Sequence, residues 1–173
     1  IKDFISKCEV CCSFGTAQPK ETLIPHEIPD RPWAKIGTDL LSIGDATYLI
    51  TVDYYSNFAE VDRLHDKKAK AVITKLKAHM AQHGICDICV SDNGLPYSSA
   101  EFAAFATEYG FRHVTSSPGY SQSNGKVESA VKTVKSLIKK AKESNTDPYL
   151  ALLDWGNTPT DSTNTSPAMR LFS

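Results

Sequence analysis

The order of strand-like and helix-like segments is the feature that most limits the folds open to this chain of 173 residues. Residues 47–54 (Thr-Tyr-Leu-Ile-Thr-Val-Asp-Tyr) are rich in β-branched and aromatic residues and almost continuously apolar, which is typical of a central buried strand. Similar short runs at 36–42 and 58–64 flank it, with Gly44-Asp45 and a Ser-Asn pair as turns. Three strands joined by short turns predict an antiparallel meander.

Amphipathic segments alternate with two further strands in the rest of the chain, because apolar residues recur there at helical spacing. The predicted helices span residues 67–83, 98–109, 123–143 and 150–157, and the predicted strands between them span 86–90 and 111–114. The order βββαβαβα predicts an α/β fold with a five-stranded mixed sheet flanked by helices.

The first 34 residues have a different character. Prolines at 19, 25, 29 and 32 favour an extended linker over residues 15–34. We therefore expect a short cysteine-bearing module at 1–14 and a main domain at 35–173. The chain does not begin with methionine, so we expect it to be part of a longer protein. No apolar run approaches the ~20 residues that cross a bilayer, and no signal peptide is visible, so we expect no membrane partner.

Three acidic residues occupy positions that suit a shared site. Asp39 lies on the first predicted strand, Asp92 follows the fourth and opens Asp-Asn-Gly, and Glu128 lies one turn into the longest helix. A carboxylate at the end of a strand is held stiffly and faces a crevice at the edge of the sheet. If the two strands are neighbours, the aspartates face each other and Glu128 closes the site from a third side.

Such a triad is suited to metal ions. Three crowded carboxylates repel one another, and hard cations such as Mg²⁺ or Mn²⁺ reverse that cost because they prefer oxygen ligands. Two such ions can activate an attacking oxygen and stabilise a leaving oxygen at a phosphodiester. The residue pattern therefore predicts two-metal phosphodiester chemistry, with three solvated surface acids as the alternative.

Positive charge is concentrated on the same long helix. The net charge is −1, but residues 123–142 hold six lysines against Glu128, a local charge of +5 that leaves −6 for the rest. Four of the lysines share a helix face with Glu128, namely Lys132, Lys135, Lys139 and Lys142. A cationic track beside a metal-binding acid suits the phosphate backbone of DNA, although a solvated lysine face is the common alternative. The Ser/Gly-rich loop before the helix is interpreted as a gate whose contacts to DNA are Tyr120, Gln122, Asn124 and Lys126.

Five cysteines and the absence of a secretory signal argue against a disulfide framework and favour a reducing compartment. His79, His83, Cys86 and Cys89 have a spacing that invites a zinc site. We reject it, because cysteines three residues apart in a strand should point to opposite faces of the sheet. Cys86 and Cys89 are interpreted as buried core thiols.

Several short motifs in combination resemble retroviral-type integrases, most closely those of gypsy-like LTR retrotransposons. The resemblance covers residues 8 to 173 and rests on Thr38-Asp-Leu40, Thr51–Phe58, Ser91-Asp-Asn-Gly94, Thr115-Ser-Ser-Pro118, Gln122–Glu128 and Ser166-Pro-Ala168. The resemblance implies an RNase H-like fold, two Mg²⁺ or Mn²⁺ ions bound by Asp39, Asp92 and Glu128, and strand transfer of element DNA ends into target DNA. It also implies a homo-oligomer acting on double-stranded DNA in the nucleus.

The same resemblance bears on the N-terminal cysteines. Cys8-x-x-Cys11 is similar to the second half of the family's His-His-Cys-Cys zinc module, whose histidines would precede Ile1. Two thiolates cannot complete a tetrahedral site, so Cys8 and Cys11 are expected to bind Zn²⁺ only in a longer chain.

Two other functions remain open. A host gene derived from such an element could encode a DNA- or chromatin-binding protein without catalysis, although the intact triad argues against it. An RNase H-type nuclease acting on RNA–DNA hybrids would share the fold, but Asn-Gly-Lys-Val-Glu and the cysteine pair favour integration.

Overall fold

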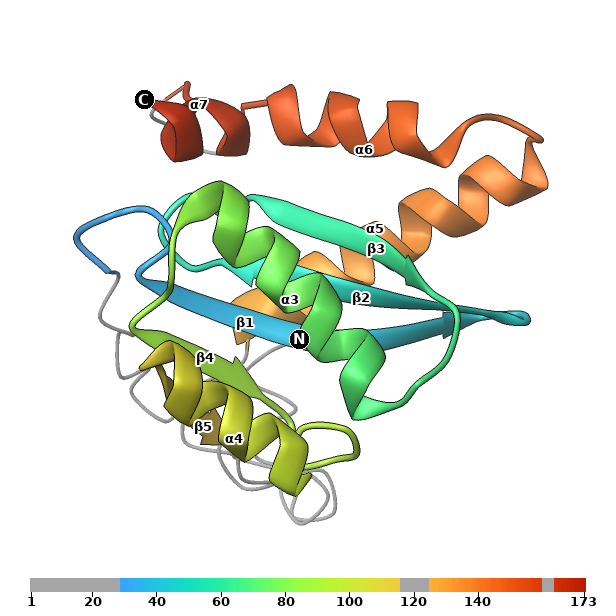
Figure 1. Ribbon diagram of the computed structural model, residues 1–173. Helices are drawn as coiled ribbons and strands as arrows, with labels where there is room; N and C mark the ends of the chain where they lie inside the picture. Colours follow the sequence, from blue (N-terminus) through green and yellow to red (C-terminus); the bar gives the residue numbers. More distant parts are fainter. Residues whose placement is uncertain (1–28, 116–124, 160–163) are drawn as a thin grey trace, which may run out of the picture.

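A computed structural model describes residues 29–115, 125–159 and 164–173, and for residues 125–128 it describes the backbone alone (Figure 1). Two groups of predicted site residues lie outside the described residues: Cys8 and Cys11, and the loop residues Tyr120, Gln122 and Asn124. Within the described residues, no helix is long and apolar enough to cross a membrane.

The centre of the molecule is a five-stranded mixed sheet with the spatial order β3-β2-β1-β4-β5. The strands span β1 (Lys35–Ile43), β2 (Ala46–Asp53), β3 (Ala59–Leu64), β4 (Ile88–Ser91) and β5 (Arg112–Thr115). The first three form the predicted antiparallel meander. Both β4 and β5 are parallel to their neighbours, since each is reached by a helical crossover. Strand β2 is central and almost wholly buried, as its continuous apolar run predicts.

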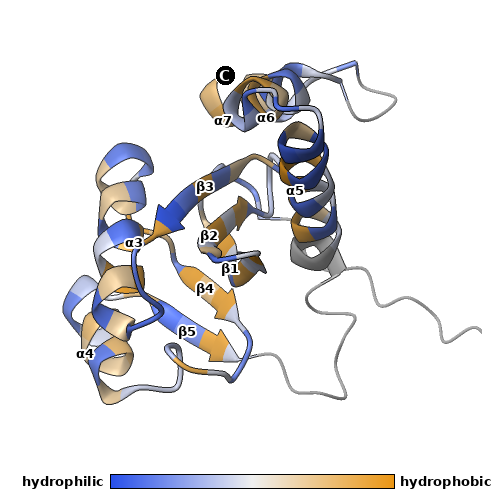
Figure 2. Cartoon of the chain, turned by 90° about the vertical axis from the view of Figure 1, so that its right-hand side faces the viewer, coloured by the Kyte–Doolittle hydropathy of each residue, from blue (hydrophilic) through white to orange (hydrophobic). Residues whose placement is uncertain are grey.

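Helices cover both faces of this sheet. They are α3 (Ala69–His83), α4 (Ala100–Tyr109), α5 (Gly125–Glu143), α6 (Pro148–Asn157) and α7 (Pro167–Phe172). Helices α3 and α4 lie on one face and α5 on the other, while α6 and α7 continue from α5 past the β3 edge (Figures 1 and 2). The predicted fold class is confirmed.

The two faces have separate hydrophobic cores. On the α3/α4 face, Val72, Leu76 and Phe102 pack against Ile36 and other sheet residues. On the α5 face, the buried residues of the helix are those predicted from its apolar stripe, including Ala130, Val134 and Ile138. Side chains alternate between the two faces along a strand, and this alternation decides which of the two cores a strand residue packs in.

Local sequence signals account for most helix boundaries. The Ser99 side chain accepts a hydrogen bond from the backbone N–H of Phe102 (3.2 Å) and caps α4, and Gly110 ends that helix in a left-handed conformation (φ 73°). Helix α6 begins at Pro148 instead of the predicted residue 150, because Asp147 caps it and proline is favoured in the first turn. Helix α7 was not predicted; Ser166 caps it in the same manner, by a bond from Met169 N.

The end of the segment predicted to be a linker packs into the core. Trp33 is 1% exposed, and its ring lies against that of His83, with a centroid distance of 4.3 Å. The Trp33 backbone N–H also donates to the carboxylate of Asp53 at the end of β2 (3.0 Å). These contacts attach residues preceding β1 to the sheet.

One prediction about the cysteines is wrong. Cys86 and Cys89 are buried, but both pack in the core on the α3/α4 face instead of on opposite faces. The alternation rule failed because β4 begins at Ile88, so Cys86 precedes the strand. Burial raises the pKa of the Cys86 thiol to about 12 and the pKa of Cys89 well above its usual value, which keeps both thiols protonated.

Candidate active site

Two neighbouring strands lead to the predicted aspartates: Asp39 lies on β1, and Asp92 directly follows β4. The two strands are parallel, and their register pairs Lys35 with Ile88 and Gly37 with Val90. Two residues further along the chain lie Asp39, still on β1, and Asp92, the residue that follows the end of β4. Neighbouring strands in a sheet are about 4.8 Å apart, so the two backbones are close at this point. The sequence predicts facing carboxylates if their two strands are neighbours. β1 and β4 are neighbours in the sheet.

Asp39 belongs to the α5 face of the sheet, and Asp92 follows a strand that contributes to that face. Asp39 is two residues from Leu41, and Asp92 is two residues from Val90; both Leu41 and Val90 pack in the core beneath α5. Residues two apart on a strand share a face, so the carboxylate of Asp39 is directed to that face. Asp39 is half-buried and Asp92 is exposed, which leaves the site open to a substrate.

Local backbone groups orient each carboxylate. The Leu40 N–H donates to Asp39 Oδ1 at 2.7 Å, and the Gly94 N–H donates to Asp92 Oδ1 at 3.1 Å. A Cβ atom at position 94 would lie only 3.1 Å from Asp92 Oδ2, so the glycine of the Asp-Asn-Gly motif allows this close approach. The second contact is an Asx turn, in which the side chain organises the backbone two residues on.

The third predicted acid lies on the helix that covers this face. Glu128 is in the first turn of α5, two residues before Ala130, which is buried against the sheet. Its side chain and that of Lys126 lie outside the described residues, so their predicted roles stay predictions.

The residues present suit a hard divalent cation. The two aspartates supply oxygen ligands, and no histidine or thiol of the described side chains joins them to favour a softer metal. Among the side chains that the structure describes, no cluster of three or more His, Cys, Asp or Glu residues could hold a metal.

The predicted lysine track is present on the surface of α5. Lys132, Lys135, Lys139 and Lys142 are all exposed. Lys139 lies 3.9 Å from Glu143, a long and solvent-exposed pair, and Lys142 Nζ is 3.5 Å from the carbonyl oxygen of Ile43. Exposed pairs of this kind contribute little stability, so the cationic heads remain available to phosphate groups.

Two buried polar pairs beneath the site were missed by the sequence analysis. On the α3/α4 face, Thr38 Oγ1 and the Tyr97 hydroxyl are 3.0 Å apart, and Ser91 Oγ lies 2.8 Å from His113 Nε2. Burial is the main cause that raises the pKa of Tyr97, and the negative charges of Asp39 and Asp92 add to it. Burial also lowers the pKa of His113. No sequence motif distinguishes these residues, because their partners come from segments distant in the sequence.

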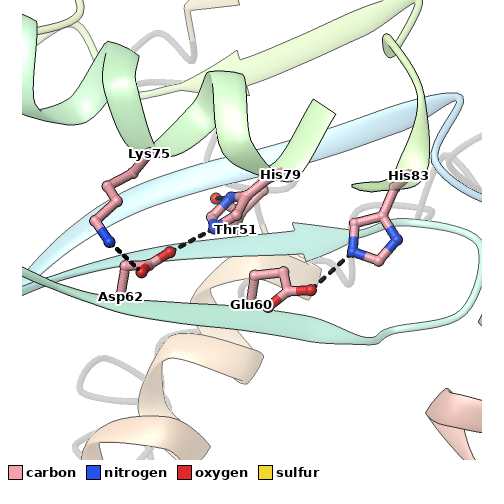
Figure 3. A network of polar contacts seen from close by, with 6 residues as sticks. All are labelled: Thr51, Glu60, Asp62, Lys75, His79 and His83. Atoms are coloured by element: carbon pink, nitrogen blue, oxygen red, sulfur yellow. Dashed lines mark hydrogen bonds and ion pairs between the residues drawn. The ribbon is translucent and has the colours of Figure 1, made fainter. Parts of the chain in front are cut away.

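A separate polar network links α3 to the outer strands (Figure 3). Asp62 on β3 accepts hydrogen bonds from Lys75 Nζ (2.7 Å) and His79 Nε2 (2.6 Å), and His83 Nε2 lies 2.7 Å from Glu60. Since a carboxylate only accepts, Nε2 of His79 carries the proton and Nδ1 faces Thr51 Oγ1 at 3.2 Å. The side chains of His79 and His83 therefore each have a carboxylate partner.

This network predicts a pH dependence of stability. The hydrogen bond from His79, followed by that from Lys75, lowers the pKa of Asp62 from 3.8 to about 2 in the folded protein. The contribution of the ionised carboxylate is then present above pH 4 and is lost as the pH falls through 2. With a discount for its 27% exposure, we expect Asp62 to supply about 1–2 kcal/mol.

Urea denaturation of the Asp62→Asn variant from pH 5 to pH 2 checks this. The difference in unfolding free energy between the unmodified chain and the variant should be largest at pH 5 and shrink towards pH 2. The Asp66→Asn variant changes an exposed carboxylate nearby and should show no such trend. A constant difference for Asp62→Asn across this range would contradict the prediction.

Comparison with known proteins agrees with the geometry. Residues 29–121 match the family model described as the integrase core domain. The chain is 30% identical over 171 residues to an uncharacterized protein of Caenorhabditis elegans, covering 96% of this chain and 14% of that protein. It is 30% identical over 145 residues to the Pol-related polyprotein of mouse intracisternal A-particle MIA14, covering 82% of this chain and 17% of the polyprotein. The chain thus spans less than a fifth of the length of either relative.

Solved structures show the same fold. A chain of the simian T-cell lymphotropic virus intasome, solved in complex with a PP2A regulatory subunit, superposes with a TM-score of 0.76 at 19% identity, covering 99% of this chain and 66% of that chain. The HTLV-2 integrase catalytic core domain in complex with magnesium, in a trimeric form, gives a TM-score of 0.64 at 18% identity, covering 82% and 97%. These similarities identify the fold as that of retroviral integrase cores, which is RNase H-like.

Proposed function

Because the chain belongs to the integrase core domain family, we propose that it is a metal-dependent DNA integrase that cleaves and joins element DNA ends into target DNA. The observation that carries this proposal is the register of β1 and β4. That register ends two residues before Asp39 and Asp92, so it supports a shared site for the two acids near the helix that bears Glu128.

In the proposed mechanism, each acid has a simple role. Asp39 would contact both metal ions, Asp92 would hold one of them and Glu128 the other. Bound Mg²⁺ or Mn²⁺ ions supply Lewis-acid activation of the attacking oxygen and charge stabilisation at the leaving oxygen. The chain then needs no general acid–base side chain at the phosphodiester; its contribution is to position the carboxylates and to orient the DNA. The HTLV-2 core domain was solved in complex with magnesium, which supports the choice of ion.

DNA would lie along the lysine track of α5. Lys132, Lys135 and Lys139 supply exposed charge for phosphate contacts, and we propose that Lys126, Tyr120, Gln122 and Asn124 contact the DNA nearer the acids. In a longer chain, Cys8 and Cys11 would contribute to a zinc site. Action on DNA would place the protein in the nucleus.

We also propose that the chain self-associates through α6 and α7. Tyr149, Leu150, Leu153 and Phe172 are 59–69% exposed there, beside a groove of about 440 Å³ between these helices and β3. Exposed apolar patches of this kind mark protein interfaces. The intasome and the trimeric form of the structural relatives support self-association. Sedimentation of the purified chain should show a dimer or larger species, which Leu153→Glu should weaken.

A strand-transfer assay tests the proposed activity. The chain is incubated with a labelled terminal-repeat DNA end and a plasmid, in Mg²⁺ or Mn²⁺, beside a Glu128→Gln variant. We expect joined product from the unmodified chain and its loss in the variant. Full joining activity of the Glu128→Gln variant would contradict the assignment of Glu128 as a ligand in a two-metal site.

The same preparation addresses the alternative of a DNA-binding protein without catalysis. Duplex binding measured with and without chelator separates the two, since a binding-only module should hold DNA equally well when divalent cations are removed. Equal binding together with absent joining would favour the alternative.

A further inference from the structure

From the contacts beneath the two aspartates, we infer that Tyr97 is a positioning residue for the metal site: through Thr38 it ties β1 to the segment that carries Asp92. This inference rests on the proposed function, because it assigns the residue a role at the same pair of carboxylates. Tyr97 lies on the α3/α4 face of the sheet, opposite the face to which Asp39 is directed.

The hydrogen-bonded ladder between β1 and β4 ends before the two aspartates. Its pairs run from Lys35–Ile88 to Gly37–Val90, so it stops just before the two acids. Beyond Gly37, β1 continues in its pairing with β2 on the other side. The distance between Asp39 and Asp92 therefore depends also on contacts beyond the end of that ladder.

The Thr38–Tyr97 hydrogen bond lies at this point. Thr38 adjoins Asp39 and is fully buried, and Tyr97 is five residues after Asp92 and 2% exposed. Their hydroxyl oxygens are 3.0 Å apart. The Tyr97 ring packs edge-on against Phe102 of α4, with centroids 5.3 Å apart, so the phenol is attached to the core as well as to β1. A buried hydrogen bond between two packed segments restrains their separation more strongly than an exposed contact does.

The backbone of Asp92 is fixed independently from the side of β5. The Ser91 hydroxyl donates to the carbonyl oxygen of Asp92 at 2.8 Å, so its own oxygen acts as the acceptor for His113 Nε2 at 2.8 Å. This assigns the Nε2–H tautomer to His113. With Asp92 held against β5 in this way, the Thr38–Tyr97 bond restrains its position relative to β1.

A role in positioning predicts a different pattern of mutant effects from a role in packing alone. Tyr97→Phe removes one oxygen and leaves the buried Thr38 hydroxyl without this partner, so stability should fall. The double variant Thr38→Val/Tyr97→Phe removes both polar groups while it keeps their shapes, so most of the stability should return. The hydrogen bond between β1 and the segment that carries Asp92 stays lost in both variants.

The experiment measures Mn²⁺ affinity by electron paramagnetic resonance and the melting temperature by circular dichroism, both on the DNA-free chain. We expect both variants to bind Mn²⁺ about tenfold more weakly, the size typical of outer-shell partners of metal ligands. The double variant should nevertheless melt close to the unmodified chain. Thr51→Val is the matched control, because Thr51 is equally buried, pairs with Thr38 across β1 and β2, and contacts His79 instead. It should keep the Mn²⁺ affinity.

Two results would overturn the inference, and they are distinguishable. If Asp39→Asn abolishes Mn²⁺ binding but Thr38→Val/Tyr97→Phe binds as tightly as the unmodified chain, the pair serves packing alone and the proposed function stands. If Asp39→Asn leaves Mn²⁺ binding unchanged, the metal site itself is wrong, and the role of Tyr97 is lost with it.

Discussion

The Asp92→Asn variant is expected to lose DNA joining by at least about a hundredfold in Mg²⁺ while it remains folded. The substitution keeps the shape of the side chain and the oxygen that can accept from the Gly94 N–H, which lies 3.1 Å from Asp92 Oδ1 in the unmodified protein. It removes the negative charge and one oxygen ligand. Since Asp92 is exposed, little packing depends on it, and the loss should appear in activity and metal affinity instead of in stability.

Asp87→Asn provides the matched control for this experiment. Asp87 adjoins the start of the same strand, and its side chain is 63% exposed beside Arg31, to which it makes a salt bridge of 2.6 Å. Exposed pairs contribute about 0–1 kcal/mol, so this variant should retain both joining activity and stability. The comparison requires that the unmodified chain joins DNA in the same assay. Equal joining activity of Asp92→Asn and Asp87→Asn would then contradict the assignment of Asp92 as a metal-binding residue.

The parts of the fold that could be predicted are those that leave a periodic signal. Helix α5 carries apolar residues at helical spacing, and Val134 and Ile138 are buried as that spacing requires. Strand β2 is apolar on both faces because helices cover both sides of the sheet. Asp39 and Asp92 could be proposed as a pair because each occurs at a recognisable point on a strand. Whether they are adjacent depended on the strand order, which periodicity does not report.

The parts that could not be predicted depend on contacts between distant segments. The prolines before β1 favour a linker, yet Trp33 is buried because His83 and Asp53 provide partners for its ring and its backbone. Tyr97 gave no signal because its partner, Thr38, is 59 residues away. Helix α7 is only six residues long, too short for an apolar period to be recognised.

Asp53 gives the largest expected effect on stability. Its carboxylate is fully buried and accepts four hydrogen bonds: Oδ1 from the backbone N–H groups of Trp33 (3.0 Å) and Tyr55 (3.3 Å), and Oδ2 from the N–H (2.9 Å) and hydroxyl (2.6 Å) of Ser56. In Asp53→Asn, an amide NH₂ replaces one oxygen and faces two donors that it cannot satisfy. Leaving buried donors unpaired costs about 1–3 kcal/mol each when the lost acceptor is charged. We expect a total loss of roughly 2–6 kcal/mol.

That loss would be a large fraction of the roughly 5–15 kcal/mol by which a domain is stable, so urea denaturation at pH 7 should detect it clearly. Asp66→Asn is the control, since Asp66 is exposed and its Oδ1 accepts the Lys68 N–H at 2.8 Å; it should change the unfolding free energy by no more than about 0.5 kcal/mol. The sensitivity of Asp53 follows from its position between Trp33 and the turn after β2. The carboxylate joins the segment before β1 to the end of the central strand. An unfolding free energy for Asp53→Asn within about 0.5 kcal/mol of the unmodified chain would show that this junction is not needed to hold Trp33 in the core.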